Sequence, residues 1–405
     1  MSSSPTPLNP FANVPAAAKD PILGVTEAFQ ADPNPDKVNL GVGVYVDEDG
    51  RVPLLECVRR AERRLAEQAA ARGYLPIDGL AAYDRAVQEL VFGKDSEAVQ
   101  SGRVLTVQAL GGTGALRIGA DLLKRILPDS VVYISRPSWE NHRALFEAAG
   151  FAVHEYRYYD PATRALDFSG MEADLAAIPR GAIVVLHACC HNPTGVDPTP
   201  EQWRAIARTV RERDGIPFLD LAYQGFAEGI EPDAQVVRLF AETPGPVLVA
   251  SSFSKSFSLY GERIGALSIA TASREEAARV LSQLKRVIRT NYSNPPTHGA
   301  ALVATALTDA EGRALWEQEL GAMRERIKRM RAALHDRLKQ LRPADDFSHI
   351  LKQRGMFSYS GLSKLQVERL RQEHAIYAID SGRICIAALN GRNVERVARA
   401  IVAVL

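Results

Sequence analysis

The chain has 405 residues, of which 46% are hydrophobic and 24% are charged, and its formal net charge is +1. This composition is typical of a globular protein of about two domains, and it excludes a strong whole-face attraction to nucleic acid or to an anionic membrane. Apolar runs fall short of the ~20 residues of a membrane helix, and the four cysteines form neither a disulfide framework nor a CxxC pair. We therefore expect a cytoplasmic protein without a nucleic-acid or membrane partner.

The N-terminal part of the chain is expected to be extended. Residues 1–20 are rich in Ser, Pro and Ala, and they indicate an arm rather than a secretory signal. A short strand is predicted near 38–45, where glycines such as Gly43 indicate either a bulge or the close approach of a ligand or backbone. Amphipathic helices are predicted at 54–72 and 80–92.

From residue 103 to 270 the sequence alternates between apolar strands and amphipathic helices. Strands are expected near 103–109, 131–135, 151–156, 182–187, 216–221, 246–251 and 264–270. Helices are expected near 114–127, 139–149, 171–178, 200–213, 233–242 and 273–289. This alternation predicts an α/β fold with a mostly parallel sheet, in which ligands bind at the carboxyl ends of the strands.

A glycine-rich turn follows the first of these strands and opens a helix. The run Gly111–Ala115 brings backbone N–H groups and a helix N-terminus together, which favours an anion site. It is neither a Walker loop nor a dinucleotide fingerprint. A turn that binds no ligand remains the alternative.

Three further strand ends carry polar or aromatic groups. Trp139 could stack on a planar ring or belong to the core, and Asn192-Pro193 is typical of a turn that directs an amide. Asp220 could pair with a cation or cap a helix. The His and Cys residues from His187 onward match no zinc spacing, so no metal is expected.

The stretch 251–265 joins two apolar strands and holds hydroxyls, Lys255 and Arg263. A lysine between buried strands usually pairs, shifts its pKa or reacts. Nearby serines and an arginine could hold a phosphate. The stretch is consistent with a pyridoxal phosphate (PLP) site, and the alternative is a serine-rich surface turn with a solvated lysine.

These features resemble the class I (fold type I) PLP-dependent aminotransferases, in the aspartate and aromatic-amino-acid branch, over nearly the whole chain. The matching motifs are NLGVGVY, GYLPIDG, GGTGALR, PSWENH, CCHNPTG, DLAYQGF, SFSKSFSLYGER, NYSNPP, RGMFSYSGL and SGR. The resemblance implies PLP as cofactor and a fold type I structure, with a mostly parallel seven-stranded sheet flanked by helices and a smaller α/β domain.

The resemblance assigns catalytic roles to three residues. Lys255 would form the internal aldimine of a ping-pong mechanism and then move the substrate proton. Asp220 would pair with the protonated pyridine nitrogen, and Tyr223, together with Asn192, would bind the ring 3-oxygen. Trp139 would stack on the ring.

The resemblance also assigns the cofactor phosphate and the region around Asp220. Gly112, Thr113, Ser252, Ser254 and Arg263 would hold the phosphate, together with Tyr74 from a neighbouring subunit. His142 and His187 would support Asp220 from behind.

The substrate would lie between two arginines. Arg383 would bind the α-carboxylate, and Arg289 from the neighbouring subunit would meet a side-chain carboxylate, although a solvated basic helix face is the alternative for Arg289. Gly43 and Phe357 would also line the substrate site, along with Trp139 and Asn192. Active sites shared in this way imply a homodimer.

A long helix is predicted over 296–341, and a final amphipathic helix ends the chain. We expect a small domain formed by 21–50 and 325–405, and a large PLP-binding domain over 51–324. A substrate that bridges the two would favour their closure.

Within the resemblance, the motifs around Lys255 and Phe357 favour the aromatic-preferring bacterial enzymes. We expect transamination of aromatic and also acidic L-amino acids with 2-oxoglutarate, and aspartate aminotransferase is the alternative. The two arginines disfavour a PLP enzyme that catalyses a different reaction, such as β-elimination or decarboxylation. A non-catalytic PLP-binding module is disfavoured because the catalytic set is complete and no DNA-binding segment is present.

Overall fold

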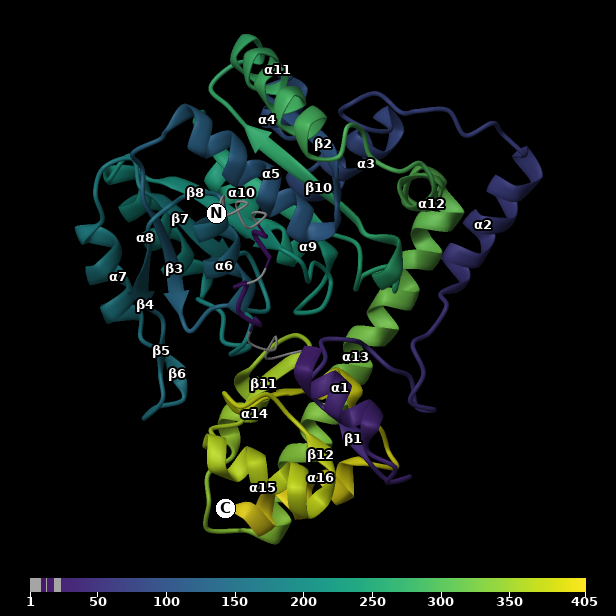
Figure 1. Cartoon of the computed structure of the whole chain (residues 1–405), viewed down its shortest axis with the longest axis vertical. Coiled ribbons are helices and arrows are strands. Elements are labelled where there is room, and N and C mark those ends of the chain that lie inside the picture. Colours follow the sequence, from purple (N-terminus) through teal and green to yellow (C-terminus); the bar gives the residue numbers. More distant parts are fainter. Residues whose placement is uncertain (1–8, 12, 18–22) are drawn as a thin grey trace, which may run out of the picture.

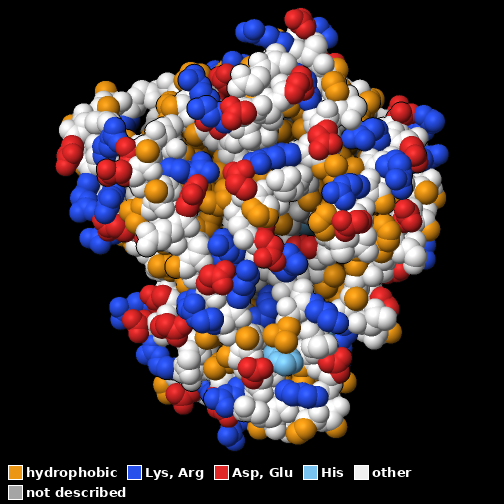
Figure 2. Space-filling model, turned by 180° about the vertical axis from the view of Figure 1, so that it is seen from behind, with side chains coloured by type: hydrophobic (Ala, Val, Ile, Leu, Met, Phe, Trp, Pro, Cys, Tyr) orange, Lys and Arg blue, Asp and Glu red, His pale blue; other side chains and the backbone are white. Residues whose placement is uncertain are grey.

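The computed structural model describes residues 9–11, 13–17 and 23–405, and the arm predicted over 1–20 lies largely outside them. Within the described residues, no helix combines the length and the hydrophobicity needed to cross a bilayer. Seen from behind, acidic and basic side chains are interspersed over the surface, in keeping with the small net charge (Figure 2).

Seven strands form the central sheet, in the order β2–β10–β9–β8–β7–β3–β4 (Figure 1). They are β2 (Val104–Leu110), β3 (Val132–Arg136), β4 (Val153–Arg157), β7 (Ile183–His187), β8 (Ile216–Leu221), β9 (Val247–Ser252) and β10 (Ile264–Ala270). The pairs are parallel except those of β10, which is antiparallel to both β2 and β9. The predicted mostly parallel α/β sheet is confirmed.

Helices cover both faces of this sheet because its strands are apolar on both sides. Along β7, Val184 and Leu186 enter one hydrophobic core, whereas Ile183 and Val185 enter the other. The second core is closed by α5 (Gly111–Ile126), α6 (Glu140–Ala148) and α11 (Arg274–Asn291). The first is closed by α3 (Ala81–Phe92), α7 (Phe168–Ala177), α8 (Pro200–Glu212) and α10 (Gln235–Ala241).

A smaller group of elements lies beyond the carboxyl ends of the strands. The long helix α13 (Ala310–Leu341) runs from the sheet region into this group, which surrounds its C-terminal end (Figure 1). It contains two short sheets, in which β1 (Val38–Asn39) pairs with β12 (Ile376–Tyr377) and β11 (Phe357–Tyr359) pairs with β13 (Arg383–Cys385). Its helices are α1 (Leu23–Ala31), α14 (Ser348–Lys352), α15 (Lys364–His374) and α16 (Val394–Val404). The remaining elements are α2 (Glu56–Gln68), α4 (Glu97–Gln100), β5 (Tyr159–Asp160), β6 (Ala165–Leu166), α9 (Ile230–Asp233) and α12 (His298–Thr308).

The prediction of one helix over 296–341 is wrong, because the segment forms α12 and α13. Asp309 between them is extended, and its side chain accepts a hydrogen bond from the backbone N–H of Gly312. An aspartate in this arrangement caps a new helix instead of continuing the old one. The apolar spacing continues across the break and conceals it.

The predicted strand at 38–45 is also shorter than expected, because only Val38 and Asn39 pair as a strand. The chain beyond them passes so close to the Phe357 ring that a Cβ on Gly43 would lie 2.7 Å from its Cζ. Close approach is therefore the correct interpretation of this glycine.

Candidate active site

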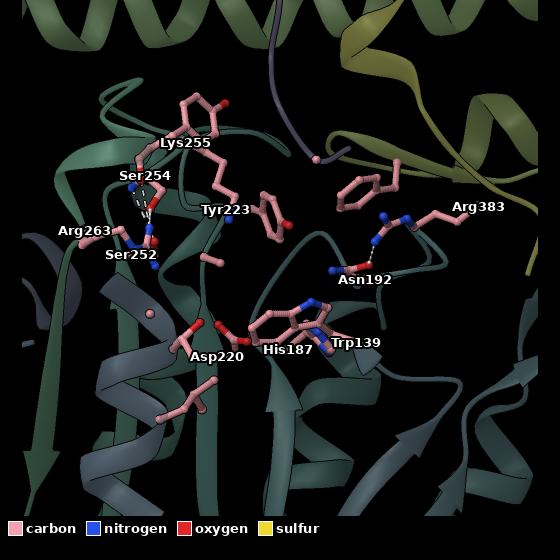
Figure 3. A pocket seen from close by; sticks show the side chains of 17 residues that line it. Trp139, His187, Asn192, Asp220, Tyr223, Ser252, Ser254, Lys255, Arg263 and Arg383 are labelled. Atoms are coloured by element: carbon pink, nitrogen blue, oxygen red, sulfur yellow. Dashed lines mark hydrogen bonds between the residues drawn. The ribbon is translucent and has the colours of Figure 1, made fainter. Parts of the chain in front are cut away.

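One edge of the sheet brings the predicted site residues together (Figure 3). The carboxyl ends of β2, β3, β7, β8 and β9 meet there, and because β10 runs in the opposite direction, its start lies at the same edge. They surround a cavity of about 240 Å³. Its walls are formed by Gly43, Gly112, Thr113, Leu116, Trp139, His187, Asn192, Asp220, Ala222, Tyr223, Ser252, Ser254, Lys255, Tyr260, Arg263, Phe357 and Arg383.

Asp220 is buried near the end of β8, so it does not cap a helix. Its Oδ2 lies 2.9 Å from Nε2 of His142, whose Nδ1 lies 2.9 Å from the Ser138 hydroxyl. Burial would raise the pKa of Asp220, but the His142 hydrogen bond and the nearby His187 and Lys255 bring it below its ordinary value. The cavity therefore holds a fixed negative charge.

Lys255 follows β9 and extends into the cavity, with its amine 5.2 Å from the centre of the Tyr223 ring (Figure 3). Burial lowers the pKa of this amine to about 8, and Arg263 and Arg383 act in the same direction against Asp220. A solvated surface lysine would keep its ordinary value. Near neutral pH this amine can therefore exchange a proton, as a catalytic base must.

The start of α5 and the ends of β9 form a cup of anion-binding groups. Arg263 donates to the Ser254 hydroxyl at 3.3 Å and to the Tyr260 carbonyl at 2.9 Å. A Cβ on Gly111 would lie 2.5 Å from the Arg263 guanidinium, and one on Gly112 would lie 3.1 Å from Ser252. Glycine is therefore needed here for the helix N-terminus to reach the arginine and the hydroxyls.

Arg383 lies on β13, and its side chain enters the cavity from the side opposite Arg263 (Figure 3). It donates to Oδ1 of Asn192 at 3.0 Å and to the Gly41 carbonyl at 2.7 Å, and its guanidinium lies 4.3 Å from the centre of the Phe357 ring. Its side chain is buried, and its Nε has no hydrogen-bond partner among the described residues. A buried guanidinium without a carboxylate partner is suited to binding a ligand carboxylate.

The amino-acid sequence matches the family model described as aminotransferase class I and II over residues 35–401. The chain belongs to the class I and II aminotransferases. It is 60% identical to an aspartate aminotransferase of Pseudomonas aeruginosa, over 98% of this chain and 99% of that one. It is 50% identical to the aromatic-amino-acid aminotransferase of Escherichia coli, over 98% and 100%.

A solved structure with the same fold is the aromatic-amino-acid aminotransferase of Burkholderia pseudomallei covalently bound to pyridoxal phosphate. It superposes with a TM-score of 0.96 at 62% identity and covers 98% of this chain and 100% of that one. This chain is accordingly a PLP-dependent aminotransferase of fold type I. Its small-molecule substrates are those of the aminotransferases.

The cavity residues of this chain match the chemical groups of the PLP cofactor. The cup at Gly112, Ser252 and Arg263 offers N–H, hydroxyl and guanidinium donors to a phosphate. Across the cavity Asp220 offers the negative charge that a protonated ring nitrogen requires, and Lys255 offers the amine.

Trp139 and His187 lie beside Asp220 (Figure 3). The His187 ring centre is 4.9 Å from that of His142, and its Nε2 has no hydrogen-bond partner within the described chain. One nitrogen of each histidine and one oxygen of Asp220 lie within 4.8 Å of one another, as metal ligands would. The direct contact between His142 and Asp220 is also what a hydrogen-bonded support for the carboxylate requires, and we interpret the group in that way.

Two predicted residues do not enter this cavity. Tyr74 is 97% exposed, and Arg289 is exposed on α11, where it donates to the Ser293 hydroxyl. Both were predicted to act in a neighbouring subunit, so their exposure agrees with the expectation without testing it.

The cavity is also lined by three residues to which the sequence analysis gave no role, Leu116, Ala222 and Tyr260. The Tyr260 hydroxyl accepts a hydrogen bond from the backbone N–H of Tyr45 at 2.9 Å. Its position between Lys255 and Arg263 in the sequence was a usable signal. Its long-range partner was not, because that partner is a backbone group more than 200 residues away in the chain.

Proposed function

We propose that this aminotransferase acts on aromatic L-amino acids and also on acidic ones, with 2-oxoglutarate as the amino-group acceptor. The observation that supports it most is the cavity that combines Lys255, Asp220 and Arg383 with the aromatic rings of Trp139 and Phe357. Its charged groups suit an amino acid, and its rings suit an aromatic side chain. The relatives carry both kinds of name, aspartate and aromatic-amino-acid aminotransferase.

The Lys255 amine acts as the proton-transfer group. When PLP is bound, it supplies an electron-withdrawing ring that acidifies the Cα–H of the substrate. A lysine with a pKa of about 8 is partly neutral near physiological pH, so it can accept that proton and return it. The amine lies 5.2 Å from the centre of the Tyr223 ring, in the same cavity as Asp220.

Asp220 would stabilise a positive charge on the ring nitrogen of the cofactor, and His142 is hydrogen-bonded to its carboxylate, with His187 nearby. A carboxylate that stays ionised in a buried site stabilises a nearby protonated nitrogen. Tyr223 and Asn192, which line the same cavity, would provide hydrogen bonds for the ring oxygen. Burial raises the pKa of Tyr223, so its hydroxyl remains a donor. Trp139 provides the stacking face.

The phosphate of the cofactor is held by Gly112, Thr113, Ser252, Ser254 and Arg263. All five line the cavity next to the start of α5. An N-terminal helix end and a guanidinium both favour a dianion, so these residues would hold the phosphate of the cofactor.

Arg383 binds the substrate α-carboxylate, near Gly43 and Phe357. In a homodimer, Arg289 of the partner subunit would meet a side-chain carboxylate, and Tyr74 of the partner subunit would reach the phosphate. Their exposure in this chain supports the proposal. An aromatic substrate requires that Arg289 move aside or be screened, because a buried unpaired charge is costly.

The small domain, residues 21–50 and 325–405, closes on the large domain, residues 51–324, when substrate binds. Arg383 of the small domain already contacts Asn192 of the large domain, so a bound carboxylate strengthens a link that exists. Crystals with and without a non-reactive substrate analogue should differ in their inter-domain angle, and identical angles would contradict closure.

We also propose that the enzyme acts in the cytoplasm. The proposal is supported by a relative from Oryza sativa, an aspartate aminotransferase that is named as cytoplasmic.

The substrate proposal is tested by kcat/KM for phenylalanine, tyrosine and aspartate, each with 2-oxoglutarate. Values within about tenfold of one another, a difference of about 1.4 kcal/mol in transition-state binding, support dual specificity. A preference for aspartate that exceeds this by orders of magnitude would make the protein an aspartate aminotransferase. That alternative is favoured by its relative from Pseudomonas aeruginosa.

A further inference from the structure

The turn after β7 places Asn192 in the active site. The Asn192 side chain is buried, and its Oδ1 accepts a hydrogen bond from Arg383 at 3.0 Å. A contact of this kind requires the backbone of the turn to be fixed to within a fraction of an ångström. The groups that fix this backbone therefore contribute to substrate binding.

The carboxylate of Asp197 binds the backbone of the turn and does not line the active-site cavity. Its Oδ2 accepts the backbone N–H of Cys190 at 2.8 Å, and its Oδ1 accepts that of His191 at 2.9 Å. Cys190 has a φ of 52°, in the left-handed region. A left-handed residue can direct successive N–H groups to one point, which makes a concave anion site. Hydrogen bonds to a charged acceptor are the stronger kind.

We infer that Asp197 is a positioning residue that holds the 190–192 turn and so places Asn192 against Arg383. The inference rests on the proposed function, in which Asn192 and Arg383 serve the cofactor ring and the substrate carboxylate. Asp197 lies outside the active-site cavity, so it acts through the backbone of the turn.

Other bonds fix the far side of the same turn. The Thr194 hydroxyl lies 2.8 Å from Nδ1 of His191, and the Gly195 carbonyl accepts the backbone N–H of Arg354 at 2.7 Å. Among the described residues, Asp197 is thus the carboxylate that accepts hydrogen bonds from the backbone of Cys190 and His191, the two residues before Asn192. It lines a second cavity of about 430 Å³ behind the turn, with Asp233, Trp203 and Glu242 among its other walls.

The test is the variant Asp197→Asn, measured as holoenzyme. The carboxamide preserves the shape but has no charge, and one of its two groups becomes a donor that faces a backbone N–H. We expect the Kd of succinate, a dicarboxylate without an amino or oxo group, to rise about tenfold, the loss of one charge-assisted bond. Burial raises the pKa of Asp197 to about 6, so binding is measured well above that pH.

Glu242→Gln is the matched control, since it makes the same chemical change on the same cavity. Within the described chain, Glu242 is not a hydrogen-bond partner of the turn. Its succinate affinity should equal that of the wild type. An Asp197→Asn protein that also equals the wild type would overturn the inference, while the wild-type transamination rate tests the proposed function separately.

A double-mutant cycle separates positioning from general loss of stability. If Asp197 acts through Asn192, Asp197→Asn should change succinate affinity less than about twofold in an Asn192→Ala background. An equal loss in both backgrounds would refute the inference. If Asp197→Asn does not fold, Asp197→Glu, which keeps the charge and displaces it by one methylene group, enters the same cycle with the same criteria.

Discussion

At the scale of single residues, the cavity alters the chemistry of the groups that it encloses. Burial lowers the pKa of Lys255 to about 8, whereas an unperturbed lysine titrates near 10.5. Because the pKa of Lys255 is lower in the folded state than in the unfolded state, its contribution to the free energy of unfolding is fully present above pH 10.5. That contribution is lost as the pH falls through about 8.

In the cofactor-free protein, we expect the rate of Lys255 modification by an amine reagent to reach a plateau a little above pH 8, because the neutral amine is the reactive form. Mass spectrometry of the labelled peptides measures this rate, with exposed Lys364 as the internal reference. A rate for Lys255 that keeps rising toward the pH of an ordinary lysine would contradict the proposed environment.

We expect Asp220→Asn to reduce kcat about 10²–10³-fold, because the amide cannot stabilise a positive charge on the ring nitrogen. Steady-state kinetics with saturating PLP measures the loss. Asp214→Asn, at an exposed carboxylate, is the control and should match the wild type. If both variants retain full activity, Asp220 does not have this role.

The residue pattern marked Lys255 and Asp220, at the ends of apolar strands, as candidates with alternatives left open, and the structure places both side chains at the cavity. Tyr260 was not predicted as a cavity residue, although its place between Lys255 and Arg263 was a signal, because its partner is a distant backbone N–H that the sequence does not reveal. The role of Asp197 was hidden for the same reason, because its two partners are main-chain groups.

At the scale of elements, close packing between β10 and the start of α5 shapes the phosphate cup. A Cβ on Gly265 would lie 2.3 Å from the backbone of Gly111, a distance that real Cβ atoms do not show. Backbone atoms cannot move aside as a flexible side chain can. The first turn of α5 can therefore pack this closely against β10 only because Gly265 has no side chain.

We expect Gly265→Ala to lower the free energy of unfolding by about 1–3 kcal/mol and to weaken PLP binding, because the displaced helix start no longer meets Arg263. Thermal unfolding and cofactor titration measure the two effects. Gly261→Ala, where an added Cβ meets nothing within 4 Å, is the matched control. Equal behaviour of the two variants would show that the contact does not shape the cup.

Elements with a strong local signal were predicted well, including the seven strands and the helix near 200–213, which begins at Pro200 behind the N-cap residue Thr199. The division between α12 and α13 was missed because Asp309 interrupts a pattern of apolar residues that continues on both sides. The short strands β11 and β13 carry Phe357 and Arg383, and their pairing is a long-range contact that local periodicity does not encode.

At the scale of the whole molecule, the proposed homodimer makes each active site depend on two chains. We expect Lys255→Ala and Arg289→Ala to be nearly inactive toward aspartate when each is alone. Mixed under conditions of subunit exchange, they should regain about a quarter of wild-type activity, because half of the dimers are hybrids with one intact site. An unchanged sum of the two activities would contradict sharing of the site.

Lys255 and its surroundings form a site that takes an amino group from one substrate and gives it to another. The direct test is the absorbance spectrum of the purified holoenzyme, titrated with phenylalanine or aspartate and then with 2-oxoglutarate. The cofactor band should bleach with either amino acid and return with the oxo acid, and Lys255→Ala should not complete the cycle. A wild-type spectrum that neither amino acid changes would contradict the account.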